Sequence, residues 1–148
     1  MISTYDATAP HLRIRIPART QIHHLNTGAL YHYQSDVERD AQLVHVRARA
    51  VLRPMFHFRD TGGLGEVPLE AAVVVDGVAL TVAAGVVCTV GDEPSEAITL
   101  SEPLVVDARL IARRAGDAWA AWYTFTGPDG RLWSVAYDQA ALRSAPSE

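Results

Sequence analysis

The chain has 148 residues, of which 49% are hydrophobic and only 7% aromatic, and it carries a formal net charge of -4. A single domain of this length buries roughly two thirds of its unfolded surface without help from disulfides or structural metal. All 13 basic residues are arginines, which excludes a Schiff base or a general base on a lysine side chain.

The charge is unevenly distributed along the chain. Residues 1–59 hold eight arginines and four acids, residues 60–106 hold eight acids and no arginine, and residues 107–148 hold five of each. Such blocks pair within one domain or between two copies, or they are simply solvated faces. Because no basic run is clustered, we expect no nucleic-acid partner.

The single cysteine, Cys88, lies in the apolar run 86–90. This position predicts an inert core thiol and excludes both an intrachain disulfide and a cysteine metal cluster. No apolar segment reaches the length of a signal peptide or a membrane span, since the run 71–90 is interrupted by Asp76 and Gly77. We therefore expect a cytoplasmic protein with no membrane partner.

The first elements in chain order are a strand and an ambiguous segment. Residues 11–16 alternate between apolar and polar side chains, which is typical of a half-buried strand. Residues 27–41 favour a short helix, because apolar positions recur at helical spacing. The alternative is a pair of strand residues around Tyr31 and Tyr33 followed by a single turn.

The middle of the chain alternates strand and turn signals. Residues 44–51 alternate again and predict a strand that ends at Arg53–Pro54, and the glycine-rich segment 61–65 predicts a surface loop. Asp76–Gly77 separates two β-branched runs, which predicts a hairpin with a type I′ turn. Gly85 inside the second run predicts a bulge or a sharp bend.

The last third predicts a meander of three strands followed by a short helix that begins at Asp138. The strands are residues 104–113, 119–126 and 132–137, with turns at 115–117 and 127–130. Together these elements predict a mainly β fold: an antiparallel β-barrel, or a barrel-like sandwich, of roughly seven to nine strands with one short helix. We expect one domain over residues 1–148, with frayed ends at 1–9 and 144–148.

All six histidines lie before residue 58, and their spacing matches no metal motif. We therefore expect neither a metal nor another cofactor. The histidines are His11, His23, His24, His32, His45 and His57.

The polar face of the central strand is the first candidate site. It carries His45, Arg47 and Arg49, joined by Arg13 and Arg15 if the first strand lies beside it. Guanidinium groups that line a pocket grip an anionic or carbonyl-bearing ligand through paired hydrogen bonds. On an outer surface the same residues only keep the strand soluble.

Aromatic side chains gather in the last hairpin and form the second candidate site. Trp119 and Tyr123 share one strand face, Trp122 lies on the other, and Trp133 belongs to the following strand. These rings form either the wall of an apolar pocket or a packed core with a dimer contact.

The segment His24–Gly28 provides a third candidate. It resembles the His-Val-Asn-Asn segment that opens the helix of hotdog-fold acyl thioesterases, although the acidic residue that the family has just upstream is absent, because Thr20, Gln21 and Ile22 occupy that region. The resemblance covers less than a fifth of the chain. It implies an α+β single hotdog as the alternative fold, thioester hydrolysis as the activity, and His24 and Asn26 as site residues.

We found no nucleophile elbow, phosphate loop or dinucleotide fingerprint, so the sequence leaves open whether the protein is an enzyme. The function we expect is that of a small-molecule-binding β-barrel, a homodimer, that acts as a cofactor-free isomerase or cyclase on an apolar substrate in an internal pocket. The alternative is a non-catalytic structural or protein-interaction module.

Overall fold

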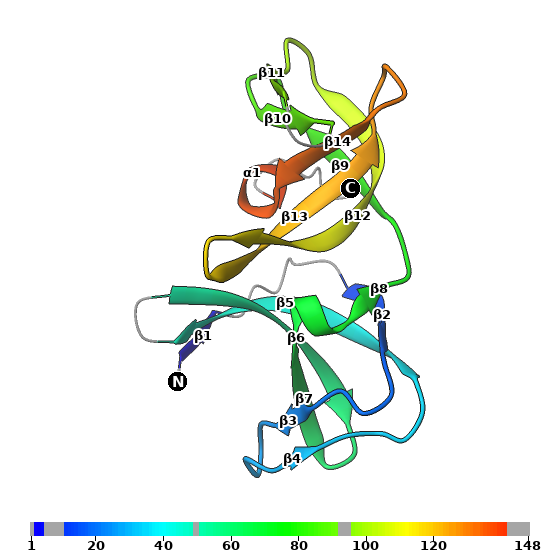
Figure 1. Cartoon of the computed structure of the whole chain (residues 1–148), viewed down its shortest axis with the longest axis vertical. Helices are drawn as coiled ribbons and strands as arrows, with labels where there is room; N and C mark the ends of the chain where they lie inside the picture. Colours follow the sequence, from blue (N-terminus) through cyan, green and yellow to red (C-terminus); the bar gives the residue numbers. More distant parts are fainter. Residues whose placement is uncertain (1, 5–10, 49–50, 92–95, 142–148) are drawn as a thin grey trace, which may run out of the picture. The chain divides into compact units, whose positions relative to one another are not determined.

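The computed structural model describes residues 2–4, 11–48, 51–91 and 96–141, without the side chains of residues 2–4, 48, 115 and 141. In this part of the chain the fold is mainly β, with two antiparallel sheets of seven and six strands and an additional strand, β1, beside the first (Figure 1). One of the sheets curls into a half-barrel. The helical segments among the described residues are a single 3-10 turn, η1 (Leu69–Ala71), and the short helix α1 (Tyr137–Ala141).

Contacts divide the chain into two compact units. The first unit comprises Met1–Asp76 and Ala112–Ala120, and the second comprises Gly77–Ile111 and Ala121–Glu148. The first sheet belongs to the first unit.

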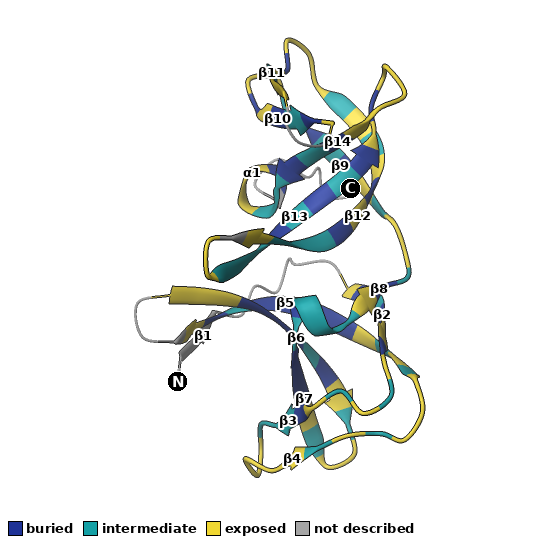
Figure 2. Cartoon of the chain, viewed as in Figure 1, coloured by how far each residue is buried: buried dark blue, intermediate teal, exposed yellow. Residues whose placement is uncertain are grey.

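The first sheet is built on two long strands, β5 and β6. Its order is β4 (Leu30–Tyr31), β3 (Ile22–His24), β7 (Gly63–Pro68), β6 (Val51–Asp60), β5 (Val37–Ala48), β2 (His11–Ile16) and β8 (Val73–Val74), and β1 (Ile2–Thr4) pairs with β5. The strand predicted at residues 11–16 is confirmed as β2, in which Leu12, Ile14 and Ile16 are buried. Figure 2 shows by colour how buried and exposed positions are distributed along the strands. Ile2–Thr4 pairs with β5, whereas residues 1, 5–9 and 144–148 of the predicted frayed ends lie outside the described residues, so the fraying stays a prediction.

Two further predictions in the first sheet need correction. Residues 27–41 contain no helix; the alternative with strand residues at Tyr31 is correct, and β5 begins already at Val37. The predicted break at Arg53–Pro54 is wrong, because β6 continues through it and Pro54 pairs with His45. Pro54 lacks a backbone N–H, which removes a single donor from the β5–β6 ladder. The other seven of the eight residue pairs maintain the ladder.

The hairpin predicted at Asp76–Gly77 does not form. The strand before it, β8, pairs with β2, whereas the strand after it, β9, pairs with β12. Gly85 has φ = 89° and lies in a turn between β9 and β10, where its N–H donates to the carbonyl of Leu100, so of the two predicted alternatives the sharp bend is correct. Segment 61–65 is a tight turn only at Thr61–Gly62 and then enters β7.

The second sheet contains the predicted meander, which is confirmed. Its order is β11 (Glu96–Thr99), β10 (Val87–Val90), β14 (Leu132–Ala136), β13 (Ala118–Thr126), β12 (Leu104–Ala115) and β9 (Val78–Val82). Tyr123, Phe125 and Trp133 are buried, and so is Cys88 on β10. Helix α1 follows β14 at once and includes Asp138 in its first turn.

Candidate functional site

A row of polar residues crosses five strands of the first sheet, and we call it the polar row. The strand register aligns one residue from each strand: His11 of β2, Gln42 of β5, His57 of β6, Glu66 of β7 and His23 of β3. Residues directly opposed in antiparallel strands project to the same face of the sheet. Among the described residues, Gln42 and Glu66 are the two hydrophilic residues that are buried when main chain and side chain are counted together.

Glu66 is held between two imidazoles. Its side chain is 6% exposed, with Oε2 lying 2.8 Å from Nε2 of His57 and Oε1 lying 3.5 Å from Nδ1 of His23. The hydrogen bond from His57 is the main cause that lowers the pKa of Glu66, and His23 adds to it, although burial acts in the opposite direction. Glu66 is therefore an ionised, buried carboxylate at neutral pH.

A cavity of about 530 Å³ opens on one side of this carboxylate. Its polar lining includes Glu66 and His23, and its apolar lining includes Leu30, Met55 and Pro68. Leu30 is 62% exposed, so the cavity has an open apolar rim. An apolar wall with a few convergent polar groups is typical of a small-molecule site.

A second cavity, of about 590 Å³, lies on the other side of the polar row. Its lining includes His11, Gln42 and His57, together with Arg59 and Leu64. His57 lines this second cavity, and its ring also contacts Glu66, which lines the first cavity.

The carboxylate–imidazole pair can carry out proton transfer. A carboxylate bonded to one ring nitrogen orients the imidazole and stabilises the imidazolium that forms when the ring accepts a proton. Histidine changes charge near neutral pH, so it serves as acid and base in the same reaction. With an imidazole on each oxygen of Glu66, the row offers two such groups around one anion.

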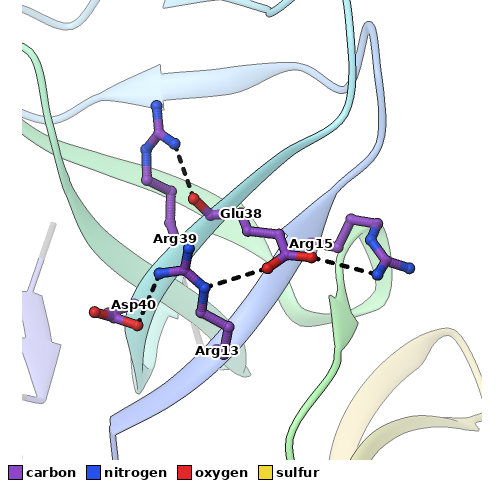
Figure 3. A network of polar contacts seen from close by, with 5 residues as sticks. All are labelled: Arg13, Arg15, Glu38, Arg39 and Asp40. Carbon is purple, nitrogen blue, oxygen red and sulfur yellow. Dashed lines mark hydrogen bonds and ion pairs between the residues drawn. The ribbon is translucent and has the colours of Figure 1, made fainter.

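The arginines expected to join the central strand face lie on the opposite face of the sheet. Arg13 and Arg15 pair in register with Asp40 and Glu38, which are an odd number of positions from His45 and Arg47 on the same strand. Figure 3 shows this network, in which Arg13 bridges Glu38 (3.3 Å) and Asp40 (3.0 Å) and Arg15 contacts Glu38 (3.3 Å).

His45 is half-buried and Arg47 is exposed, whereas Arg49 lies outside the described residues. The structure therefore brings neither Arg13 nor Arg15 to this candidate site. A ligand-binding role for His45 and Arg47 stays a prediction.

The aromatic candidates separate into core and surface. Tyr123 and Trp133 are 1% and 5% exposed, and the Trp133 indole donates to Asp129 (2.8 Å). Trp133 also lines a cavity of about 390 Å³. Trp119 and Trp122 are half-buried, and the guanidinium of Arg114 lies 5.2 Å from the centre of the Trp119 ring.

His24 and Asn26 build a turn instead of opening a helix. Nδ1 of His24 accepts from the Thr27 N–H (3.3 Å), and the Asn26 side-chain oxygen accepts from the Leu64 N–H (2.9 Å). The helix expected after Gly28 is wrong, because β4 follows. The His24 bond is local to the turn, as is usual for polar side chains in turns, whereas the Asn26 bond ties the turn to β7.

The described residues contain no group of three or more His, Cys, Asp or Glu that could hold a metal ion. No helix in the described part of the chain is long and apolar enough to span a bilayer. No protein-family model matches the chain, no curated protein matches its sequence, and no solved structure matches its fold.

Proposed function

We propose that this protein binds a small, largely apolar molecule against the polar row and catalyses a cofactor-free isomerisation or cyclisation by proton transfer. The observation that carries the proposal is the buried Glu66 carboxylate between His57 and His23, at the edge of a cavity with an apolar wall. A buried ion held by titratable partners beside a cavity is typical of functional sites.

Each group has a distinct role in this reaction. Leu30, Met55 and Pro68 hold the apolar part of the substrate, because they remove hydrocarbon from water. His23 faces the same cavity and removes a proton from carbon next to a carbonyl, and Glu66 stabilises the imidazolium that results. The imidazolium then returns the proton to another atom of the same substrate.

The test uses simple ring ketones in deuterated water, with exchange of the hydrogens next to the carbonyl followed by proton NMR. We expect exchange above the buffer rate, reduced by about 10²–10⁴-fold in His23→Gln and Glu66→Gln. His32→Gln is the matched control, since His32 is exposed and outside the polar row. Equal exchange in all variants would refute the proton-transfer role.

Ligand binding has a separate test, native mass spectrometry of the purified protein. Extra mass that is lost on denaturation, and that Met55→Asp abolishes, supports a ligand in the apolar cavity. We further propose that the protein forms a full barrel, that it is a homodimer and that it is cytoplasmic. The curvature of one sheet supports the full barrel.

A non-catalytic interaction module is the second candidate, and exposed apolar side chains favour it. Val105 is 75% exposed, and Leu132 and Val87 are 54% and 52% exposed. Apolar residues of this kind often contact a partner, here a second copy. Dimer formation that persists in high salt and is lost in Val105→Asp, together with no exchange activity, would favour this function.

A further inference from the structure

Three aromatic rings surround a cavity at the end of the first sheet, away from the polar row. The cavity, of about 360 Å³, is lined by the rings of His24, Tyr31 and Tyr33 and by the carboxylate-bearing Asp60. The Tyr31 and Tyr33 rings are 5.9 Å apart and meet at 83°, and the His24 ring lies 6.2 Å from Tyr31 at 57°. Tyr31 and Tyr33 therefore contact each other edge to face, and all three aromatic residues line the same cavity.

Asp60 fixes the two tyrosines in place. Its side chain is only 4% exposed, and its two oxygens accept from the hydroxyls of Tyr31 and Tyr33 at 2.5 Å each. Because both rings are held before a ligand arrives, binding does not have to order them. The backbone N–H of Thr61 also donates to Asp60 (2.9 Å), which ties the cage to the turn after β6.

A cation already lies against this cluster. The guanidinium carbon of Arg39 is 5.3 Å from the centre of the Tyr33 ring, and a guanidinium nitrogen is 3.6 Å from Asp60. Aromatic faces attract cations through the negative charge on the ring face, and quaternary ammonium groups are the usual ligands of aromatic cages. The small neighbours Thr27 and Ala29 leave room for such a group.

We propose that the cavity formed by His24, Tyr31, Tyr33 and Asp60 is an aromatic cage that binds an organic ammonium ion, such as a trimethylammonium group. The ligand's charge lies against the ring faces and within reach of the Asp60 carboxylate. This site is separate from the polar row and does not depend on the proposed isomerase activity.

The experiment compares choline with its neutral isostere 3,3-dimethylbutan-1-ol, each titrated into the full chain and followed by proton NMR. We expect choline to shift the tyrosine ring signals and to bind about tenfold more tightly than the alcohol, since only the charged ligand gains from the rings. Equal affinity for both, or binding of neither, would overturn the cage, and this comparison requires no variant.

Variants then locate the site. Tyr31→Leu is expected to weaken choline binding about tenfold, whereas Tyr31→Phe keeps the ring and most of the affinity. Trp119→Leu removes another ring that lies beside an arginine and should leave choline binding unchanged. Choline binding that survives Tyr31→Leu would contradict the proposal, whereas His23→Gln, which disables the polar row, should have no effect on it.

Discussion

Both sheets bury aromatic rings, but among the described residues the first sheet also buries a carboxylate and an amide, whereas the second sheet anchors its buried Trp133 to a carboxylate in an exposed turn. Glu66 and Gln42 lie within the first sheet at 6% and 8% exposure. In the second sheet the buried Trp133 reaches Asp129 in a surface turn, so the carboxylate stays in water while the ring is dry. Burying a charge is costly unless it is paired, and the second sheet avoids that cost. The stability of the first sheet therefore depends on the partners of its buried carboxylate, whereas the carboxylate that anchors Trp133 in the second sheet stays exposed.

The largest losses of stability should come from core substitutions and should be similar in both sheets, because each sheet has buried aromatic rings. Phe58 and Phe125 are 2% and 3% exposed, and we expect Phe58→Ala and Phe125→Ala each to lower the free energy of unfolding by about 3–5 kcal/mol. Urea denaturation followed by circular dichroism measures this loss. A loss below about 1 kcal/mol for Phe58→Ala alone would mean that the first sheet lacks a comparable core.

The core and the meander were predictable because their signals are local. The alternating side chains of residues 11–16 specify the strand that those same residues form. The turn at Gly127–Gly130 likewise lies directly between the two strands that it joins. The hairpin at Asp76–Gly77 failed for the opposite reason, since partner choice is not local and the neighbouring strands pair with β2 and β12. Turn residues permit a hairpin but do not select its strands.

The polar row was not predictable, because its members are brought together only by register. His23 and Glu66 are far apart in sequence and meet through the β3–β7 pairing. One local signal existed: His57 between Phe56 and Phe58 must face away from the core if both phenylalanines face it. Glu66 lies in β7, and the loop predicted at 61–65 hid the start of this strand, so the sequence did not place Glu66 in a sheet.

Gly65 offers a smaller test of how closely the first sheet is packed. A Cβ at this position would lie 2.6 Å from the Phe58 ring and 3.0 Å from the Tyr31 hydroxyl. We expect Gly65→Ala to cost about 1–3 kcal/mol of unfolding free energy, because the ring must move. Gly77→Ala is the control, since its Cβ would meet only a carbonyl at 3.5 Å, and we expect no resolvable change. Equal loss in both variants would contradict the packing argument.

The Glu66 carboxylate should make the stability of the first sheet depend on pH. Its pKa is lowered in the folded state, so its contribution is present above the ordinary value near 4.5 and is lost as the pH falls through the folded pKa. We expect Glu66→Gln to lower the free energy of unfolding by about 1.5 kcal/mol at pH 7. This value is at the lower end of the range for hydrogen bonds to charged groups, because His23 is partly exposed. Urea titrations at pH 7 and pH 3 measure it, and a loss that persists undiminished at pH 3 would refute the assignment.

The surface charges of the first sheet should contribute least. Arg13, Arg15, Glu38 and Asp40 form a connected network, yet every side chain in it is at least 40% exposed. Exposed ion pairs are screened by salt and lose side-chain entropy when they form, so their net effect is close to zero. We therefore expect Arg13→Gln to leave the urea midpoint unchanged in physiological salt, in contrast to Glu66→Gln. A fall in the midpoint as large as that of Glu66→Gln, removed by high salt, would show that the network holds β2 and β5 together. In that case charge, and not only the buried row, would distinguish the first sheet from the second.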